Sequence, residues 1–397
     1  MPSFNTAVSR AALMLCGGLL AAACATSATA PPKEALPPPL PKDAVLPEIP
    51  QDIPPAPAPA NQAALPHVVL MSMGGTIASR ASTRLNITNY GGKEVQRVDP
   101  QDWVHDLPEL GNIARVTTED FRPPVDRPSG PETFEDLEMV AKRLNQLAQD
   151  PTVDGVVVTH GTNTMTEVAY YMDLVVKTHK PIVFVGSQRP WTGLSGDGPL
   201  NLYNAVRVAA SKDAWDKGVL HCMNQNINAA RDVMKTSAYR VQTFRGPDAG
   251  ALGFADPDKV VFYREPVRRH TYQSEFAGFD YTSVPAVEVA YGYEEAPGYL
   301  IDAMVEHGAK GIVIDGTGAG SATTSQTEAI KRAQAKGVVF VMTTRTRSGR
   351  VQDTPRRRES HIVAGDDLQP EKARLLLQLA LTKTTDLNEI KRIFDEY

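Results

Sequence analysis

The sequence is poor in cysteine, with three in 397 residues. Two of them, Cys16 and Cys24, lie near the N-terminus, so Cys222 alone remains in the folded body. An internal disulfide is therefore excluded there. A single cysteine within the apolar run at residues 218–223 is typical of core packing, and we assign it no chemistry.

The chain also lacks a strongly basic surface. Its formal net charge is −5, and its longest basic cluster is the three arginines at residues 356–358. Nothing in this pattern predicts nucleic-acid binding. With 42% hydrophobic and 22% charged residues, the composition is that of a globular protein of two or three domains, and no internal repeat is present.

No apolar run is long enough to span a bilayer. The longest lies at residues 11–23, follows the single charge of Arg10, and ends in small residues before Cys24. We interpret residues 1–24 as an export signal. Two alternatives stay open: lipidation of Cys24, as in bacterial lipoprotein signals, or plain secretion with cleavage near residue 28 or 30. Both place the protein in the periplasm or in another exported location.

Changes in composition along the chain indicate where the linker and the domains begin and end. Residues 25–65 are dominated by Pro and Ala, as expected of a disordered linker or tether. We expect a larger N-terminal domain at residues 66–262 and a smaller C-terminal domain at residues 286–397. The segment between them, residues 263–285, has weak periodicity and mixed charge, and we interpret it as a connector.

The folded part alternates short β-branched runs with amphipathic stretches. This pattern predicts an α/β fold with mainly parallel sheets, covered by helices on both faces. The predicted strands are His67–Met73, Asp154–Thr159, Pro181–Gly186, Gly218–Met223, Gly311–Asp315 and Gly337–Thr343. The predicted helices are Thr133–Gln149, Thr164–Thr178, Pro199–Ser211, Thr323–Lys336, Pro370–Thr382 and Asp386–Tyr397.

A glycine-rich turn follows the first predicted strand, where residues 73–78 read MGGTIA. Glycines permit a sharp turn and close backbone approach, which would present the hydroxyl of Thr76 outward. Taken alone, the segment favours a simple glycine-rich turn with a capping threonine. A phosphate loop is disfavoured because no Gly-Lys-Ser/Thr continuation follows.

Three more polar clusters lie where strands end, the usual place for ligand sites in open α/β sheets. Residues 159–164 read THGTNT and precede a predicted helix, which is also compatible with an ordinary helix cap. Residues 186–205 are rich in Gly, Asp and Asn, as a long surface loop would be. Residues 231–236 read RDVMKT, in which Lys235 alone would pass for a solvated charge.

Taken together and in order, these clusters resemble the bacterial L-asparaginase family, in particular its exported type II enzymes. The similarity covers residues 66–397 and includes the DGPLNLYNA run at residues 197–205 and the PEKARLLLQLAL run at residues 370–381. It implies an amidohydrolase that converts the side-chain amide of L-asparagine, or of L-glutamine, to the acid and ammonia. It also implies a small-molecule amide substrate, no cofactor, no metal and a homo-oligomer, either tetramer or dimer.

The resemblance further implies roles for individual positions. Thr76 matches the threonine nucleophile that forms an acyl-enzyme, and Tyr90 the tyrosine that assists it. Thr162 matches the second catalytic threonine, and Lys235 the lysine that sets its protonation. The substrate-binding positions implied are Gly75, Ser129, Gly161 and Asn163. A partly desolvated lysine is a reasonable proton acceptor because its pKa falls on burial.

Three positions depart from the family's pattern. Asn163 replaces an aspartate that pairs with the substrate's α-ammonium, Ala319 replaces an asparagine in the GTGAG loop at residues 316–320, and residues 353–358, DTPRRR, are basic where an acidic residue is expected. Loss of a charge-assisted bond should weaken binding of a free α-amino acid by about 1–3 kcal/mol. Two alternatives therefore stay open: an amidase for an asparagine derivative that lacks a free α-ammonium, and an inactive binding or scaffold protein.

Overall fold

The computed structural model describes residues 64–88, 90, 96–122, 133–278 and 282–397. The predicted export signal at residues 1–24, with Cys24, lies outside the described residues, as does nearly all of the predicted linker at residues 25–65. Within the described ranges, no helix combines the length and the hydropathy that a membrane span requires.

An eight-stranded sheet organises the N-terminal part, in the order β12-β11-β8-β7-β6-β5-β1-β4. Five strands are parallel: β1 (His67–Ser72), β4 (Arg115–Asp120), β5 (Gly155–Thr159), β6 (Ile182–Val185) and β7 (Val219–Met223). The other three extend the sheet in antiparallel pairs: β8 (Asn226–Ala229), β11 (Gly253–Ala255) and β12 (Val260–Phe262).

The central strands form where the sequence carries continuous β-branched and apolar residues. Strands β5 and β6 read GVVVT and IVFV and are buried along their whole length, as parallel strands covered on both faces must be. The prediction of a mainly parallel α/β sheet is thus confirmed. Strand β4, which reads RVTTED, was not predicted; it lies at an edge and alternates between exposed and partly buried residues.

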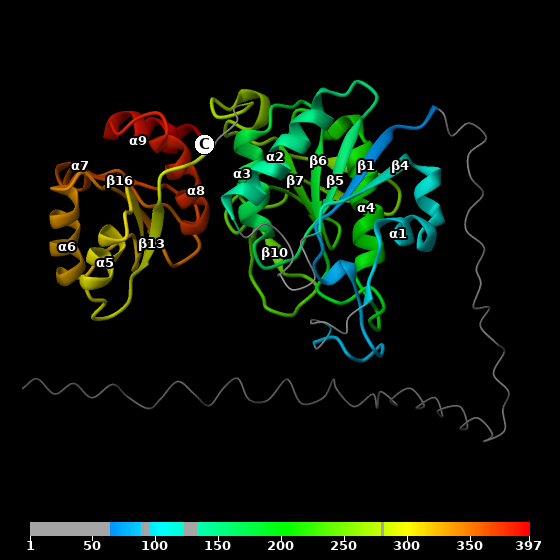
Figure 1. The fold of residues 1–397 in the computed structure, drawn as a ribbon, viewed down its shortest axis with the longest axis horizontal. Coiled ribbons are helices and arrows are strands. Elements are labelled where there is room, and N and C mark those ends of the chain that lie inside the picture. Colours follow the sequence, from blue (N-terminus) through cyan, green and yellow to red (C-terminus); the bar gives the residue numbers. More distant parts are fainter. Residues whose placement is uncertain (1–63, 89, 91–95, 123–132, 279–281) are drawn as a thin grey trace, which may run out of the picture. The chain divides into compact units, whose positions relative to one another are not determined.

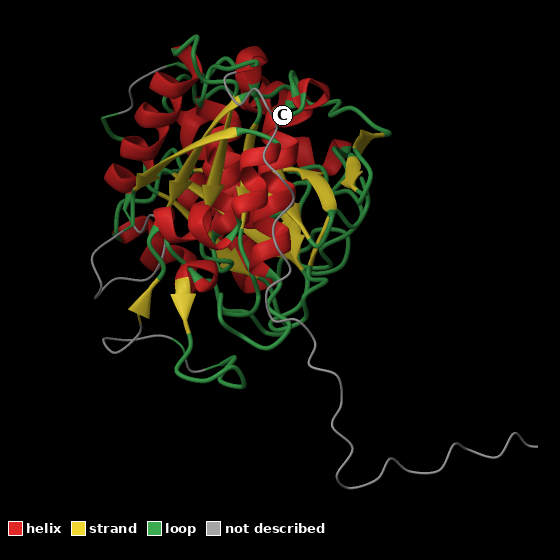
Figure 2. Ribbon diagram, turned by 90° about the vertical axis from the view of Figure 1, so that its right-hand side faces the viewer, coloured by secondary structure: helices red, strands yellow, loops and turns green. Residues whose placement is uncertain are grey.

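Helices cover both faces of this sheet. Helix α4 (Gly198–Ala210) contacts strands β5, β6 and β7, whereas α2 (Phe134–Gln149) and α3 (Met165–Val175) contact each other. Figure 1 shows α2 and α3 on one side of the central strands and α4 on the other. In Figure 2 the strands are enclosed by helices. A short helix, α1 (Pro100–Asp106), packs near strand β4.

A second, four-stranded parallel sheet organises the C-terminal part, in the order β13-β14-β15-β16. Its strands are β13 (Val287–Tyr291), β14 (Gly311–Gly316), β15 (Val339–Thr344) and β16 (Ile362–Ala364). The accompanying helices are α5 (Tyr299–Glu306), α6 (Thr324–Gln334), α7 (Pro355–Glu359), α8 (Pro370–Leu381) and α9 (Leu387–Glu396). Helix α9 begins as predicted, with the Asp386 side chain accepting from the N–H of Asn388.

The two faces of this smaller sheet belong to different hydrophobic cores. Val313 and Val341 pack with helix α8 in the core that also contains the larger sheet. Their neighbours Ile312, Ile314 and Phe340 point to the opposite face and pack in a separate core with helices α5 and α6. Because side chains alternate along a strand, one sheet serves both cores, and helix α8 joins the C-terminal sheet to the larger core.

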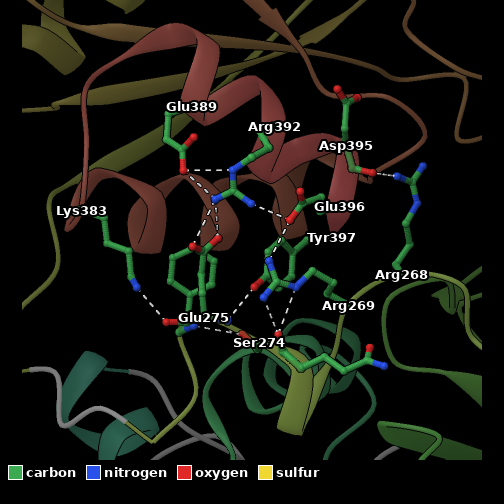
Figure 3. A network of polar contacts seen from close by, with 12 residues as sticks. Arg268, Arg269, Ser274, Glu275, Lys383, Glu389, Arg392, Asp395, Glu396 and Tyr397 are labelled. Carbon is green, nitrogen blue, oxygen red and sulfur yellow. Dashed lines mark hydrogen bonds and ion pairs between the residues drawn. The ribbon is translucent and has the colours of Figure 1, made fainter.

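The described residues 263–278 are tied to helix α9 by a polar network (Figure 3). Arg269 pairs with Glu396 at 2.7 Å, and Arg392 pairs with Glu275 at 2.9 Å. The backbone N–H of Glu275 donates to the hydroxyl of Tyr397 at 2.7 Å. Several partly buried charges thus hold this segment, which contains little regular secondary structure, against the last helix.

Cys222 is fully buried within strand β7. Burial raises the pKa of its thiol to about 12 because the thiolate would be desolvated. The expectation that this residue serves core packing is confirmed.

Candidate active site

Two glycines connect strand β1 to Thr76, and both have a left-handed backbone conformation in which any other residue would be strained. Gly74 and Gly75 have φ values of 85° and 90°. Thr76 then opens a single 3₁₀ turn, Thr76–Ala78, and is partly exposed. The left-handed glycine pair turns the chain sharply at the end of the strand, where the Thr76 hydroxyl remains accessible.

Gly75 also marks a close contact with the second threonine segment. A Cβ atom on Gly75 would lie 2.5 Å from both the Cα and the N atom of Gly161. The two segments meet because they leave neighbouring parallel strands: Ser72 of β1 pairs with Thr159 of β5, and the N–H of Met73 donates to the carbonyl of Thr159 at 2.9 Å. The fold therefore brings the two threonine segments into direct backbone contact.

Tyr90 lies against the first threonine. Its hydroxyl is 3.0 Å from Oγ1 of Thr76, and either oxygen can donate the hydrogen bond. Both side chains are partly buried. The structure thus pairs these two predicted catalytic residues.

Thr162 lies between strand β5 and helix α3 and is 7% exposed. Helix α3 begins after the N-cap residue Thr164, whose side chain makes no capping hydrogen bond. The THGTNT segment is therefore not explained by side-chain capping. The N-terminus of α3, with its partial positive charge, lies three residues beyond Thr162.

Lys235 meets Thr162 from a short antiparallel pair, β9 (Met234–Lys235) with β10 (Phe244–Arg245). Its Nζ atom donates to Oγ1 of Thr162 at 2.8 Å. Partial burial lowers the pKa of Lys235. Among the described residues, no carboxylate lies within ion-pair distance of this amine. The pair can therefore exchange a proton, with Lys235 as the acceptor once it is neutral.

His160, inside the same segment, is a structural residue. It is fully buried, and burial lowers its pKa to about 4, so the ring is neutral near pH 7. Its Nδ1 atom lies 2.7 Å from the carbonyl oxygen of Gly161, which can only accept, so Nδ1 carries the proton. The ring thereby orients the Gly161 peptide.

The predicted substrate-binding positions are only partly described. Gly75 and Gly161 form the close contact given above, and Asn163 is exposed directly beside Thr162. Ser129, with its neighbours at residues 127–130, lies outside the described residues.

The polar loop at residues 186–205 is held by its own side chains. The carboxylate of Asp197 accepts from the N–H groups of Gln188 and Arg189 at 2.9 and 3.0 Å, and from the amide of Asn201 at 3.1 Å. Gln188 in turn donates to the carbonyl of Arg240 at 3.2 Å. This loop therefore supports residues near the β9–β10 pair that carries Lys235.

Two of the departures from the family pattern lie together in the C-terminal domain. The Nη2 atom of Arg357 is 3.5 Å from the carbonyl oxygen of Ala319 and 3.4 Å from that of Gly320. Within the described part of the chain, no hydrogen bond connects them to Thr76, Thr162 or Lys235. In the same described part, no group of three His, Cys, Asp or Glu residues is arranged to hold a metal ion.

Lys372 was not predicted to have a role, although it lies in the PEKAR run noted in the sequence. It is fully buried, and its Nζ atom donates to the carbonyls of Ala230, Arg231 and Val233, two to five residues before Lys235. The available signal was a lysine at a core-facing position of a helix, between apolar residues.

Two family models match the chain. The model described as "Asparaginase, N-terminal" matches residues 67–268, and the model described as "Glutaminase/Asparaginase C-terminal domain" matches residues 286–394. Together they cover most of the described chain.

Similar proteins carry related names. A "Glutaminase-asparaginase" of Pseudomonas fluorescens biotype A is 40% identical over 337 residues, 84% of this chain and 91% of that protein. A "Probable L-asparaginase periplasmic" of Haemophilus influenzae is 39% identical over 344 residues, 85% of this chain and 95% of that protein. A crystal structure named as a probable cytoplasmic L-asparaginase from Campylobacter jejuni superposes with a TM-score of 0.78 at 36% identity, covering 84% of this chain and all of that one.

Proposed function

The chain belongs to the asparaginase family, and from this premise we propose that it hydrolyses the side-chain amide of L-asparagine, or of L-glutamine, through a threonine acyl-enzyme. The products are the corresponding acid and ammonia. Of the alternatives raised by the sequence, an inactive scaffold is the least favoured, because such a protein has no need of two hydrogen-bonded catalytic pairs.

One observation carries the proposal: the backbone contact between Gly75 and Gly161. Thr76 and Thr162 lie in the two segments that make this contact, which leave adjacent strands at the same edge of the sheet, and Tyr90 and Lys235 hydrogen-bond to them. The carboxyl ends of parallel strands are where open α/β sheets bind their ligands.

In this proposal Thr76 is the nucleophile. Its Oγ1 attacks the amide carbon, the C–N bond breaks, and the leaving NH2 group takes up the proton lost from Oγ1 and departs as ammonia. The remaining ester on Thr76 is hydrolysed by water, which restores the hydroxyl. Tyr90, hydrogen-bonded to Oγ1 at 3.0 Å, orients the nucleophile and shares its proton.

Thr162 and Lys235 supply the proton acceptor. A neutral Lys235 takes the Thr162 proton along their 2.8 Å hydrogen bond, which lets Thr162 accept a proton from the reacting groups. The lowered pKa of Lys235 raises the fraction of neutral amine at a given pH. The positive end of helix α3, just beyond Thr162, favours the negative charge that develops on the amide oxygen.

Ammonia release and mass spectrometry together test this assignment. With asparagine as substrate, Thr76→Ala should lower kcat by about 10³-fold or more, as expected for loss of a nucleophile. Acid-quenched wild type should carry an added acyl mass on the peptide that contains Thr76, and Thr76→Ala should not. Ammonia release at wild-type rate by Thr76→Ala, or an acyl mass on another peptide, overturns the assignment.

A second candidate substrate is an asparagine whose α-amino group is acylated or peptide-linked. Two differences from the family pattern favour this substrate, because both remove a negative charge that would pair with a free α-ammonium group. Asn163 carries no charge where the family has an aspartate, and the guanidinium of Arg357 lies beside Ala319. A panel of free and N-acetylated asparagine distinguishes the two substrates by kcat/KM. A higher kcat/KM for free asparagine than for its N-acetyl derivative rejects this second candidate.

We also propose that the protein is exported, with Cys24 as a membrane tether if it is lipidated. The apolar segment at residues 11–23 supports this, and one relative is named as periplasmic although the similar solved structure is named as cytoplasmic. Fractionation of cells expressing the full chain, with and without globomycin, tests it. Membrane retention that is lost in Cys24→Ser indicates the tether, soluble periplasmic protein indicates secretion, and cytoplasmic protein rejects export.

A homo-oligomer, tetramer or dimer, completes the proposal. Tyr291 and Tyr293 stack near edge strand β13 with ring centroids 6.3 Å apart, and they are 52% and 40% exposed. Exposed aromatic residues at a sheet edge are typical of a surface that another subunit covers. Light scattering coupled to gel filtration gives the mass directly, and a monomer contradicts the proposal.

A further inference from the structure

Lys372 is a buried cation to which the proposed reaction assigns no part. It is fully inaccessible to solvent, although it lies near the N-terminus of helix α8. Its Nζ atom donates to the carbonyl oxygens of Ala230 and Arg231, both at 2.8 Å, and of Val233 at 2.6 Å. An ammonium group has three N–H donors, so this arrangement uses all of them.

The three acceptors belong to one tight turn, residues 230–233, between strands β8 and β9. Asp232 and Val233 both donate through their N–H groups to the carbonyl of Ala229, which bends the chain there. Lys235 follows Val233 by two residues. The turn whose carbonyls converge on Lys372 thus ends two residues before the lysine that donates to Thr162.

The side chain of Arg231 holds the same turn from a second direction. Its Nη2 atom pairs with Asp367 at 2.7 Å, and its Nε atom donates to the carbonyl of Tyr397 at 2.9 Å. Both partners lie in the C-terminal domain. The turn before Lys235 is thus fixed by that domain through two cations.

Helix α8 also supports the other member of the catalytic pair. It packs against helix α3, whose first turn follows Thr162. Tyr170 of α3 places its ring centroid 5.9 Å from Nζ of Lys372. One helix therefore contacts both the element that follows Thr162 and the turn that precedes Lys235.

We propose that Lys372 is a positioning residue that sets the hydrogen bond between Lys235 and Thr162 by clamping the turn at residues 230–233. The proposal rests on the proposed function, since it concerns the proton acceptor of that reaction. Without the clamp, three buried carbonyls lose their donors and the turn relaxes. The Lys235 amine then moves away from Thr162 and becomes more exposed to water.

The charged state of Lys372 follows from its surroundings. Burial lowers its pKa to about 8, as does the positive charge of Arg231 to a smaller extent, whereas Glu371, Asp232 and Asp173 act in the opposite direction. Three carbonyl acceptors favour the ammonium form, because a neutral amine has only two N–H groups to donate. The clamp is therefore at full strength near neutral pH.

The principal test is Lys372→Met, which keeps the length and apolar stem of the side chain but removes its three donors. We expect kcat for asparagine to fall about 10²-fold, as is typical of a catalytic group displaced by about 1 Å, with KM within twofold of wild type. We also expect a shift in the acid limb of the pH profile, the range in which kcat rises with pH. This limb should move to higher pH, because a more exposed Lys235 has a higher pKa. Simple loss of folded protein would scale kcat without moving this limb.

Arg374→Met is the matched control. Arg374 lies on the same helix and also donates to a backbone carbonyl, that of Val287 at 3.0 Å, but this carbonyl belongs to strand β13. We expect loss of this hydrogen bond to lower the free energy of unfolding and to leave kcat unchanged. An equal fall in kcat in Arg374→Met, or an unchanged kcat and acid limb in folded Lys372→Met, overturns the proposal.

Double variants show whether Lys372 acts through Lys235. If it does, adding Lys372→Met to Lys235→Met causes no further loss of residual kcat, since interacting positions are not additive. Full additivity contradicts the proposal.

If Lys372→Met does not fold, Lys372→Gln replaces it. The amide retains two donors, so kcat should lie between the wild-type value and that expected for Lys372→Met, whereas a wild-type kcat counts against the clamp. Retained ammonia release in Lys235→Met and Thr162→Ala would instead reject the proposed function, whatever Lys372 does.

Discussion

The Nζ atom of Lys235 lies 2.8 Å from Oγ1 of Thr162, although the two residues are 73 positions apart in the sequence. The lysine comes from the short β9–β10 pair, and the threonine from the loop between strand β5 and helix α3. No carboxylate among the described residues accompanies them, so burial alone lowers the pKa of the amine. This relationship makes the pH dependence of the reaction sensitive to any negative charge added beside Thr162.

Asn163→Asp adds such a charge. A carboxylate next to Thr162 favours the protonated amine, so the pKa of Lys235 rises and the neutral base is available only at higher pH. We expect the acid limb of kcat/KM to move to higher pH, and KM for free asparagine to fall because the α-ammonium gains a partner. Initial rates of ammonia release measured from pH 5 to pH 10 check both. Asn388→Asp on helix α9 is the control, and a limb that moves equally in both variants contradicts the explanation.

Tyr90→Phe removes one hydroxyl from the first catalytic pair. The 3.0 Å hydrogen bond to Oγ1 of Thr76 is lost while the ring is retained. Because assistance by a positioned acid or base contributes about 10² to 10⁴ in rate, we expect kcat to fall by about 10²-fold with little change in KM. Steady-state kinetics with asparagine measure this. A kcat within threefold of wild type would mean that Tyr90 does not assist Thr76.

Gly75→Ala tests the contact that brings the two loops together. The new Cβ atom would lie 2.5 Å from backbone atoms of Gly161 at a residue with a φ of 90°. We expect loss of activity together with a lower free energy of unfolding, measured by urea denaturation.

Gly337→Ala separates the two causes of that loss, which are backbone strain at a positive φ and the clash with Gly161. Gly337 has a similar φ of 83°, but a Cβ atom there meets nothing within 4 Å. It should reduce the free energy of unfolding by about 1–2 kcal/mol through the backbone alone and leave kcat unchanged. Equal behaviour of the two variants would show that the Gly161 contact is unimportant.

Asp173 should make the protein less stable as the pH rises. Burial raises its pKa from 3.8 to about 7, so between these values the folded state binds more protons than the unfolded state. Its contribution to the free energy of unfolding then declines with increasing pH, by at most about 1.4 kcal/mol per pH unit. Asp173→Asn keeps an acceptor for the N–H of Val219 and removes the titration.

Urea denaturation at pH 5 and pH 8 compares this variant with wild type. We expect Asp173→Asn to gain stability relative to wild type at pH 8 more than at pH 5. Asp302→Asn is the control: its hydrogen bond with Arg332 holds the pKa of Asp302 below the ordinary value of 3.8, so this group should cause no stability difference between pH 5 and pH 8. The same pH trend in both variants would rule out Asp173 as the cause.

The sequence predicted the buried elements better than the edges of the sheets. Strands β5 and β6 are continuous apolar runs, and their ends were predicted to within one residue. Strands β4 and β13 are edge strands with exposed polar or tyrosine residues, so their hydrophobic pattern is weak. Strands β9 and β10 have two residues each, too few to show a periodic pattern in the sequence.

The site was predicted by motif and order, not by geometry. Spacing alone could not show that Lys235 reaches Thr162, because a short strand pair and a loop support the lysine. Lys372 was missed because a buried ammonium is recognisable only when its three carbonyl acceptors are seen together. The roles of Thr76, Tyr90, Thr162 and Lys235 stay predictions until the variants are measured.

The inaccessible thiol of Cys222 provides an internal sensor of sheet opening. It belongs to strand β7, which lies between β6 and β8, and the raised pKa of its thiol suppresses the reactive thiolate. An alkylating reagent should therefore modify this cysteine only in molecules whose larger sheet has opened, and peptide mapping distinguishes it from Cys16 and Cys24. The labelling rate would then report how often the scaffold beneath Thr162 and Lys235 unfolds under native conditions.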